Sequence, residues 1–142
     1  MSSGPVRLGG DPPSPYEGQI GFSRVVATDG VVFIGGTTSV TSDGAVLGDT
    51  PYEQTTEILR KIAHELVRGG ASVGDVVQAR IYVTDISRAQ EVGRALGETF
   101  ADIRPVMTMV EVSALIDPRM LVEIEAVAIV DRDRDRDRDR AR

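Results

Sequence analysis

Residues 105–128, PVMTMVEVSALIDPRMLVEIEAVA, decide the fold of this chain. Apolar side chains alternate in two runs of this stretch, which predicts two β-strands, each with two distinct faces. The second run places Glu123 and Glu125 on the face opposite Val122, Ile124 and the two alanines that follow. Carboxylates inside so apolar a β pair are uncommon, because a buried charge must be paired or used. These two glutamates are therefore the first candidates for functional or ion-pairing residues.

Composition limits the kinds of site that the chain can build. Its 142 residues suit one domain, and 41% hydrophobic residues are enough for a core. The chain has no cysteine and a single histidine, His64, which excludes disulfides, thiol catalysis and a multi-histidine metal site within one chain. We therefore expect no metal and no cofactor. No apolar run reaches the length of a membrane span and the N-terminus lacks a secretory pattern, so a cytoplasmic protein is expected.

The charge balance argues against nucleic-acid binding. The net charge is −6, and without the tail 131–142 the chain carries ten basic and seventeen acidic side chains. An acidic body repels phosphates, and 4% aromatic residues leave little for base stacking. We expect neither nucleic acid nor membrane as a partner.

The ends of the chain differ in composition from the middle. Residues 1–18 are rich in Gly, Pro and Ser and are expected to form a flexible lead-in to a domain over 19–130. The tail 131–142 is an almost perfect Asp-Arg repeat, which is typical of a disordered, solvated segment. Asp29-Gly30 separates apolar runs at 24–27 and 31–34, which predicts a β-hairpin with a type I′ turn.

Two helices are predicted between the hairpin and the final strands. Thr50, Pro51 and Glu53 form an N-terminal capping box ahead of an apolar stripe that ends at Gly69-Gly70. The stripe comprises Ile58, Leu59, Ile62, Ala63, Leu66 and Val67. A half-buried strand follows, with Val77, Ala79, Ile81 and Val83 facing inward. Ser87 with Gln90 is expected to begin a second helix, with Ala89, Val92, Leu96 and Phe100 inward.

The element order β-β-α-β-α-β-β predicts an α+β domain. One mixed sheet with two helices packed on a single face is the economical arrangement. The other face of the sheet is also apolar, since it carries side chains such as Val106 and Val110, and this favours coverage by another subunit.

The chain resembles the Rid family of reactive intermediate deaminases, also called the YjgF family and formerly labelled endoribonuclease L-PSP. The matching pattern is P-x-R-[ST]-x-V-x-V-x-x-L followed by V-E-I-E-A-[IV]-A, matched here from Pro105 to Leu115 and by VEIEAVA at 122–128. Weaker matches in order are Gly-Phe-Ser at 21–23, FIGG at 33–36 and YVTD at 82–85. The resemblance implies the chorismate-mutase-like YjgF fold and a homotrimer with a central β-barrel and ligand clefts between subunits.

The resemblance also implies site residues. The family's aromatic pocket residue corresponds to Phe22, with Ser23 beside it, and its substrate-contacting glycine turn to Gly35 and Gly36. Its water-positioning glutamate corresponds to Glu123, the candidate catalytic residue. The family's substrate-binding arginine corresponds to Met107, which cannot pair with a carboxylate. This departure, together with Phe22, predicts a pocket more apolar than the family's active type.

Several residues keep two interpretations at this stage. Glu123 either activates water or pairs structurally with an arginine, and Gly35 and Gly36 either offer amides to an anion or permit close backbone approach. Glu111 and Glu125 are expected to be structural, with Arg80 as a partner. Arg24, Arg104 and Arg119 are candidate replacement cations, although surface positions or ion pairs are expected for each, and His64 is expected to be a partly exposed structural residue.

Three functions follow for comparison. The first is hydrolytic deamination of an enamine or imine in an intersubunit cleft, without the usual carboxylate-binding arginine. The second is a non-catalytic trimer that binds a small metabolite. The third, an endoribonuclease, is disfavoured by the acidic charge.

Overall fold

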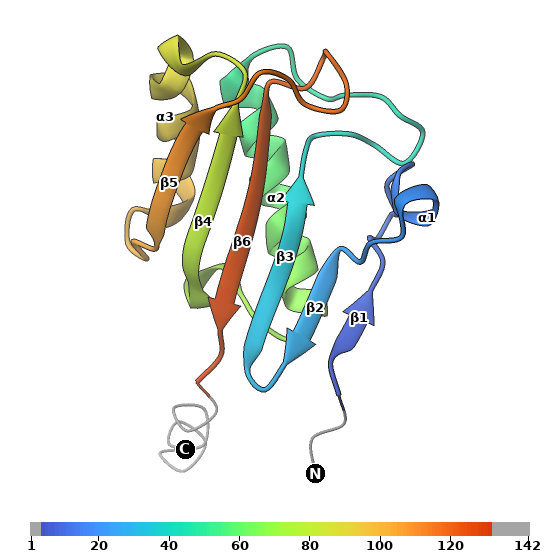
Figure 1. Ribbon diagram of the computed structural model, residues 1–142. Coiled ribbons are helices and arrows are strands. Elements are labelled where there is room, and N and C mark those ends of the chain that lie inside the picture. Colours follow the sequence, from blue (N-terminus) through green and yellow to red (C-terminus); the bar gives the residue numbers. More distant parts are fainter. Residues whose placement is uncertain (1–3, 132–142) are drawn as a thin grey trace.

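The structure is a computed structural model that describes residues 4–131 (Figure 1). The Asp-Arg tail expected to be disordered therefore lies outside the described residues from 132 onward. Short 3-10 turns occur at Val73–Asp75 and Ile86–Arg88. The helices and strands, in chain order, are β1 (Val6–Leu8), α1 (Glu17–Ile20), β2 (Val25–Thr28), β3 (Val31–Thr37), α2 (Pro51–Arg68), β4 (Val76–Val83), α3 (Ala89–Phe100), β5 (Val106–Glu111) and β6 (Val122–Ile129).

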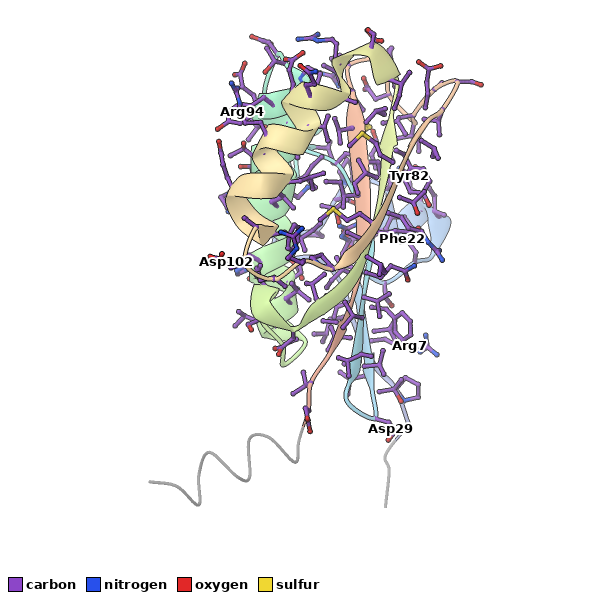
Figure 2. The ribbon with its side chains drawn as sticks, turned by 90° about the vertical axis from the view of Figure 1, so that its left-hand side faces the viewer. Arg7, Phe22, Asp29, Tyr82, Arg94 and Asp102 are labelled. Atoms are coloured by element: carbon purple, nitrogen blue, oxygen red, sulfur yellow. The ribbon has the colours of Figure 1, made fainter. Side chains whose placement is uncertain are left out.

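These strands form one mixed sheet in the order β1-β2-β3-β6-β4-β5. All neighbours are antiparallel except β4 and β5, which α3 connects as a parallel pair. The long helices α2 and α3 cover one face of the sheet, as Figures 1 and 2 show from two directions. The predicted α+β architecture is therefore confirmed, with β1 and α1 as additions.

The hairpin between β2 and β3 has the turn that its sequence predicts. Asp29 has φ of 49° and Gly30 has φ of 81°, so both central residues are in the left-handed region. Positive φ at both positions is the property that a type I′ turn requires, and its twist suits the flanking strands.

Helix α2 begins where the sequence predicts and buries most of the expected stripe. The Thr50 hydroxyl accepts a hydrogen bond from Glu53 N at 3.1 Å, while the Glu53 carboxylate binds the Thr50 hydroxyl instead of closing the second half of a capping box. Val67 is 68% exposed, so its place in the stripe was predicted wrongly. Among residues 4–131, no helix is long and apolar enough to cross a membrane.

Strand β4 and helix α3 each depart from expectation at their first residues. The register of β4 against β6 shifts between Val76 and Gln78, so Val76 is buried and Val77 is 40% exposed. This bulge interrupts the simple alternation that placed Val77 inside. Ser87 belongs to the 3-10 turn, which Asp85 caps through Ser87 N, and α3 has no side-chain cap.

The faces of β6 agree with the pattern of its sequence. Val122, Ile124 and Ala128 are fully buried against the helices, whereas Glu123 and Glu125 project from the other face. The core fills the layer between the sheet and α2 and α3; its largest fully buried apolar side chains are Ile58, Ile62, Leu66, Ile81, Met120 and Ile124.

The N-terminal segment takes part in the sheet. β1 pairs with β2, and two carboxylates hold the chain that follows: Glu17 accepts bonds from Gly10 N and Ser14 N, and Glu65 accepts one from Asp11 N. These contacts hold the N-terminal segment, which was expected to be a flexible lead-in, across the end of the sheet beside α2.

Candidate functional site

Glu123 stands at the wall of a small cavity at one end of the sheet. The cavity has a volume of about 220 Å³, and we call it the Glu123 cavity. Besides β6, four parts of the chain meet there: the N-terminal segment, the end of β3 with the loop after it, helix α2, and the loop before β6. The lining residues are Ser14, Tyr16, Ile20, Phe22, Arg24, Gly36, Thr38, Val40, Lys61, Ile116, Met120 and Glu123.

A bulge in β3 brings the backbone of Gly36 against Glu123. Between Ile34 and Thr37 the strand advances three residues while its partner β6 advances from Ala126 to Ile124. A methyl group built on Gly36 would lie 3.1 Å from Glu123 Oε2 and 3.2 Å from its carboxyl carbon. The close-approach interpretation of this glycine is therefore supported, because any side chain there would push Glu123 out of its place.

The surroundings of Glu123 favour its neutral form. Burial raises the pKa of its carboxyl, and the nearby Glu125 acts in the same direction, while Arg24 opposes both. A half-buried carboxylate with a raised pKa beside a cavity has the properties of a general base.

Arg24 is the cation nearest this chemistry. It is only 7% exposed, and it donates from Nη1 to Gly36 O at 2.5 Å and from Nη2 to the Thr37 hydroxyl. The expectation of a solvated surface position for Arg24 was wrong, because its guanidinium lies under the β3 bulge. Arg119 does behave as expected: it is exposed and pairs with Asp117 at 2.8 Å.

Lys61 lines the same cavity from α2. Its ammonium donates to Thr38 O at 2.6 Å and to Val40 O at 2.9 Å, which ties the helix to the loop after β3. Burial, with Arg24 as the second cause, lowers the pKa of Lys61 to about 8. The sequence analysis missed this residue. A signal was available in the spacing, since Lys61 lies seven residues after Gln54 and four before Glu65. Both of those polar residues are buried, whereas Lys61 is partly buried.

Much of the rest of the wall is apolar, beside the polar residues Ser14, Tyr16 and Thr38. Phe22, Ile20, Ile116 and Met120 supply the apolar part, and Figure 2 shows Phe22 on the side of the sheet away from the long helices. The cavity therefore combines the apolar lining expected from the sequence with two cations that it did not foresee.

The remaining predicted site residues lie elsewhere. Ser23 and Gly35 line a separate cavity of about 340 Å³ over the open face of the sheet, next to Phe33 and Glu125.

Met107 is also apart from Glu123 within one chain. It sits on β5, the edge strand of the sheet, opposite Ala79 of β4, and is 40% exposed. One strand, β4, lies between β5 and β6 in the sheet. A side chain at 107 can therefore meet a Glu123 cavity only if that cavity belongs to a neighbouring subunit.

Three other titratable residues have structural partners. Glu125 accepts a hydrogen bond from the Tyr82 hydroxyl at 2.6 Å and lies 3.6 Å from Arg80, and Glu111 accepts from Ile86 N. His64 is half-exposed and lies 3.3 Å from Asp11. Within residues 4–131, no three side chains gather as metal ligands.

Comparison with known proteins gives a consistent result. The family model described as Endoribonuclease L-PSP matches residues 15–130. A protein of Streptomyces coelicolor described as uncharacterized, SCO2049, is 34% identical over 115 residues, which cover 81% of this chain and 86% of that protein.

Solved structures agree with this match. Rv2704 of Mycobacterium tuberculosis, described as a member of the highly conserved YjgF/YER057c/UK114 family, is 44% identical with a TM-score of 0.80, covering 89% of this chain and all of that one. YyfA of Yersinia pestis, described as a protein of unknown function in the conserved Rid family, is 28% identical with a TM-score of 0.72, covering 78% of this chain and 88% of that one.

Proposed function

Because the chain belongs to the endoribonuclease L-PSP family, the YjgF or Rid family, we propose that it binds a small metabolite in the Glu123 cavity and hydrolyses an enamine or imine there. The observation that carries this proposal is the placement of Glu123, held against Gly36 at the wall of a cavity, with a raised pKa. The acidic charge of −6 gives no support to nucleic-acid cleavage.

The proposed reaction uses Glu123 as a base. An enamine first tautomerises to the imine; water then adds to the imine carbon as the Glu123 carboxylate accepts one of its protons. Return of that proton to the nitrogen gives the neutral carbinolamine. Its hydroxyl proton then passes through Glu123 to the nitrogen, which leaves as ammonia, and a carbonyl product remains. Imine and water are thereby converted to ketone and ammonia, and no other reactant is needed. General base catalysis of this kind contributes a factor of about 10²–10⁴.

We also propose that the protein is a homotrimer. The open face and edge of the sheet expose large apolar side chains in the described chain, namely Phe33, Val106, Val110 and Ile129. Coverage by other subunits would remove this surface from water. Light scattering should give three times the mass of one chain, and a monomeric mass would reject the trimer.

The second candidate is a binding protein without catalysis. Met107 favours it, because this side chain supplies no guanidinium to a neighbouring cleft. The two functions separate in one assay: freshly generated 2-iminobutanoate is mixed with the protein, and release of the keto acid is followed. Faster release than in buffer, lost in Glu123→Gln, supports the deaminase. Release at the buffer rate rejects 2-iminobutanoate hydrolysis, and 2-oxobutanoate binding by that same preparation would then favour the binding protein.

A further inference from the structure

Arg24 and Lys61 together line two cavities, and Arg24 also lines the cavity of about 340 Å³ over the open face of the sheet. Besides the Glu123 cavity, both line a second cavity of about 440 Å³ between the N-terminal segment and α2. Ser14 and Val40 are the other residues that line both spaces. The two cations therefore form part of a partition between the Glu123 cavity and a larger neighbour.

The hydrogen bonds of both cations end on uncharged oxygens. Arg24 donates to Gly36 O and the Thr37 hydroxyl, and Lys61 donates to two backbone carbonyls. A guanidinium has five N–H donors and an ammonium has three, so each cation keeps donors to spare. In the described part of the chain, neither forms an ion pair.

The carboxylates around the second cavity are engaged in other bonds. Glu17 binds the Gly10 and Ser14 amides, Glu65 binds Arg68 at 2.6 Å, and Glu57 binds Arg60. Burial lowers the pKa of Arg24 and of Lys61, and the carboxylates oppose this only through space. Glu17, Glu65 and Glu123 act on Arg24 in this way, and Glu57 and Glu17 act on Lys61. Arg24 and Arg60 act on Lys61 in the opposite direction.

Two neighbouring cations with unused donors, half or more buried and facing a cavity, form a place for an anion. We propose that Arg24 and Lys61 together hold a carboxylate of the ligand at this partition. The subsite would replace the arginine whose place Met107 takes. It would bind the carboxylate from α2 and from the residue before β2, instead of from a neighbouring β5. This inference rests on the proposed ligand binding in the Glu123 cavity. It assigns the substrate class as an enamine or imine that carries a carboxylate.

The test uses the fact that Lys61 is the only lysine of the chain. An anion bound at its ammonium raises the pKa of that group and protects it from acylation. The pKa is measured by pH-dependent acylation and mass spectrometry, with 2-oxobutanoate, its neutral methyl ester and inorganic phosphate as probes. We expect a rise in pKa and protection with 2-oxobutanoate and neither effect with the ester. An effect of phosphate alone, or no effect of any probe, would overturn the carboxylate subsite.

Variants then separate this inference from the proposed reaction. Calorimetry should show that Lys61→Met lowers the affinity for 2-oxobutanoate by about ten- to hundredfold. Lys61→Arg, which keeps a cation at this position, should retain most of the affinity. Arg94→Met, on the solvent side of α3, is the matched control and should bind as the unaltered protein does (Figure 2). Glu123→Gln should keep 2-oxobutanoate binding. If Glu123→Gln keeps all hydrolysis while Lys61→Met loses affinity, the proposed mechanism fails and the subsite stands; if Lys61→Met binds normally, the subsite fails whatever the hydrolysis rate.

Discussion

The carboxylate of Glu123 packs against the α-carbon of Gly36, with only 3.1 Å between Oε2 and the position that a Cβ at 36 would take. Gly36→Ala should therefore displace Glu123 by a few tenths of an ångström without straining the backbone, since Gly36 is not among the glycines with positive φ. We expect hydrolysis to fall about tenfold, because small misplacements of a catalytic group are costly. The measurement is the rate of keto-acid release alongside the urea midpoint, and an unchanged rate would show that the position of Glu123 is unimportant.

Gly97→Ala provides the control for that substitution. A Cβ on Gly97 in α3 would meet nothing within 4 Å. Replacing a glycine by alanine inside a helix stabilises it by about 0.5–1 kcal/mol. The urea midpoint should therefore rise while the rate stays the same.

The raised pKa of Glu123 predicts where activity disappears in acid. The base must be deprotonated, so the rate should fall as the pH drops through the folded pKa, at a higher pH than for an ordinary glutamate. Loss of the Arg24 charge in Arg24→Met should move this fall in rate to still higher pH, because Arg24 lowers the pKa of Glu123. If the hydrolysis rate instead fell at the pH at which an exposed glutamate titrates, Glu123 would not be the base.

Local signals in the sequence were sufficient for much of the fold. The turn at Asp29-Gly30 and the cap at Thr50 depend on residues next to one another, and both form as predicted. The strand β1 was missed because its three residues are largely exposed and it is held by pairing with the distant strand β2, while Glu65 of α2 holds the chain that follows it at Asp11. Only contacts between distant segments specify such an element.

The residues of the candidate site were likewise predicted only in part. The resemblance brought Phe22, Gly36 and Glu123 to one cavity, as the structure does. It could not show that Arg24 turns inward, because the acceptors of its guanidinium are made by the β3 bulge. Nor could it show Lys61, whose carbonyl partners come from a loop with no regular pattern.

Met107→Arg tests whether a neighbouring subunit completes the cleft. Met107 is 40% exposed on the edge strand, so an arginine fits there without burial of its charge. In a trimer we expect affinity for 2-oxobutanoate to rise about tenfold or more, as a bond to a charged group is added. Val67→Arg is the control, since Val67 is 68% exposed on α2, away from the open face of the sheet. Equal gains in both variants would indicate a general charge effect instead of a specific contact.

The buried Lys61 should also make stability depend on pH. Its pKa is about 8 in the folded protein against 10.5 ordinarily, so between these values the unfolded chain binds more protons. The free energy of unfolding attributable to this group must then rise as the pH increases from about 8 to 10.5, and stay flat below. Tyrosines also titrate in alkaline solution, and hydrogen bonds to Glu98 and Glu125 raise the pKa values of Tyr52 and Tyr82. Lys61→Met, which retains both tyrosines, is therefore the reference. Urea unfolding at a fixed protein concentration should show the unaltered protein gaining about 1–3 kcal/mol on Lys61→Met across this window. A constant difference would mean that Lys61 titrates as an exposed lysine does and that its ammonium is not held in a desolvated cavity wall.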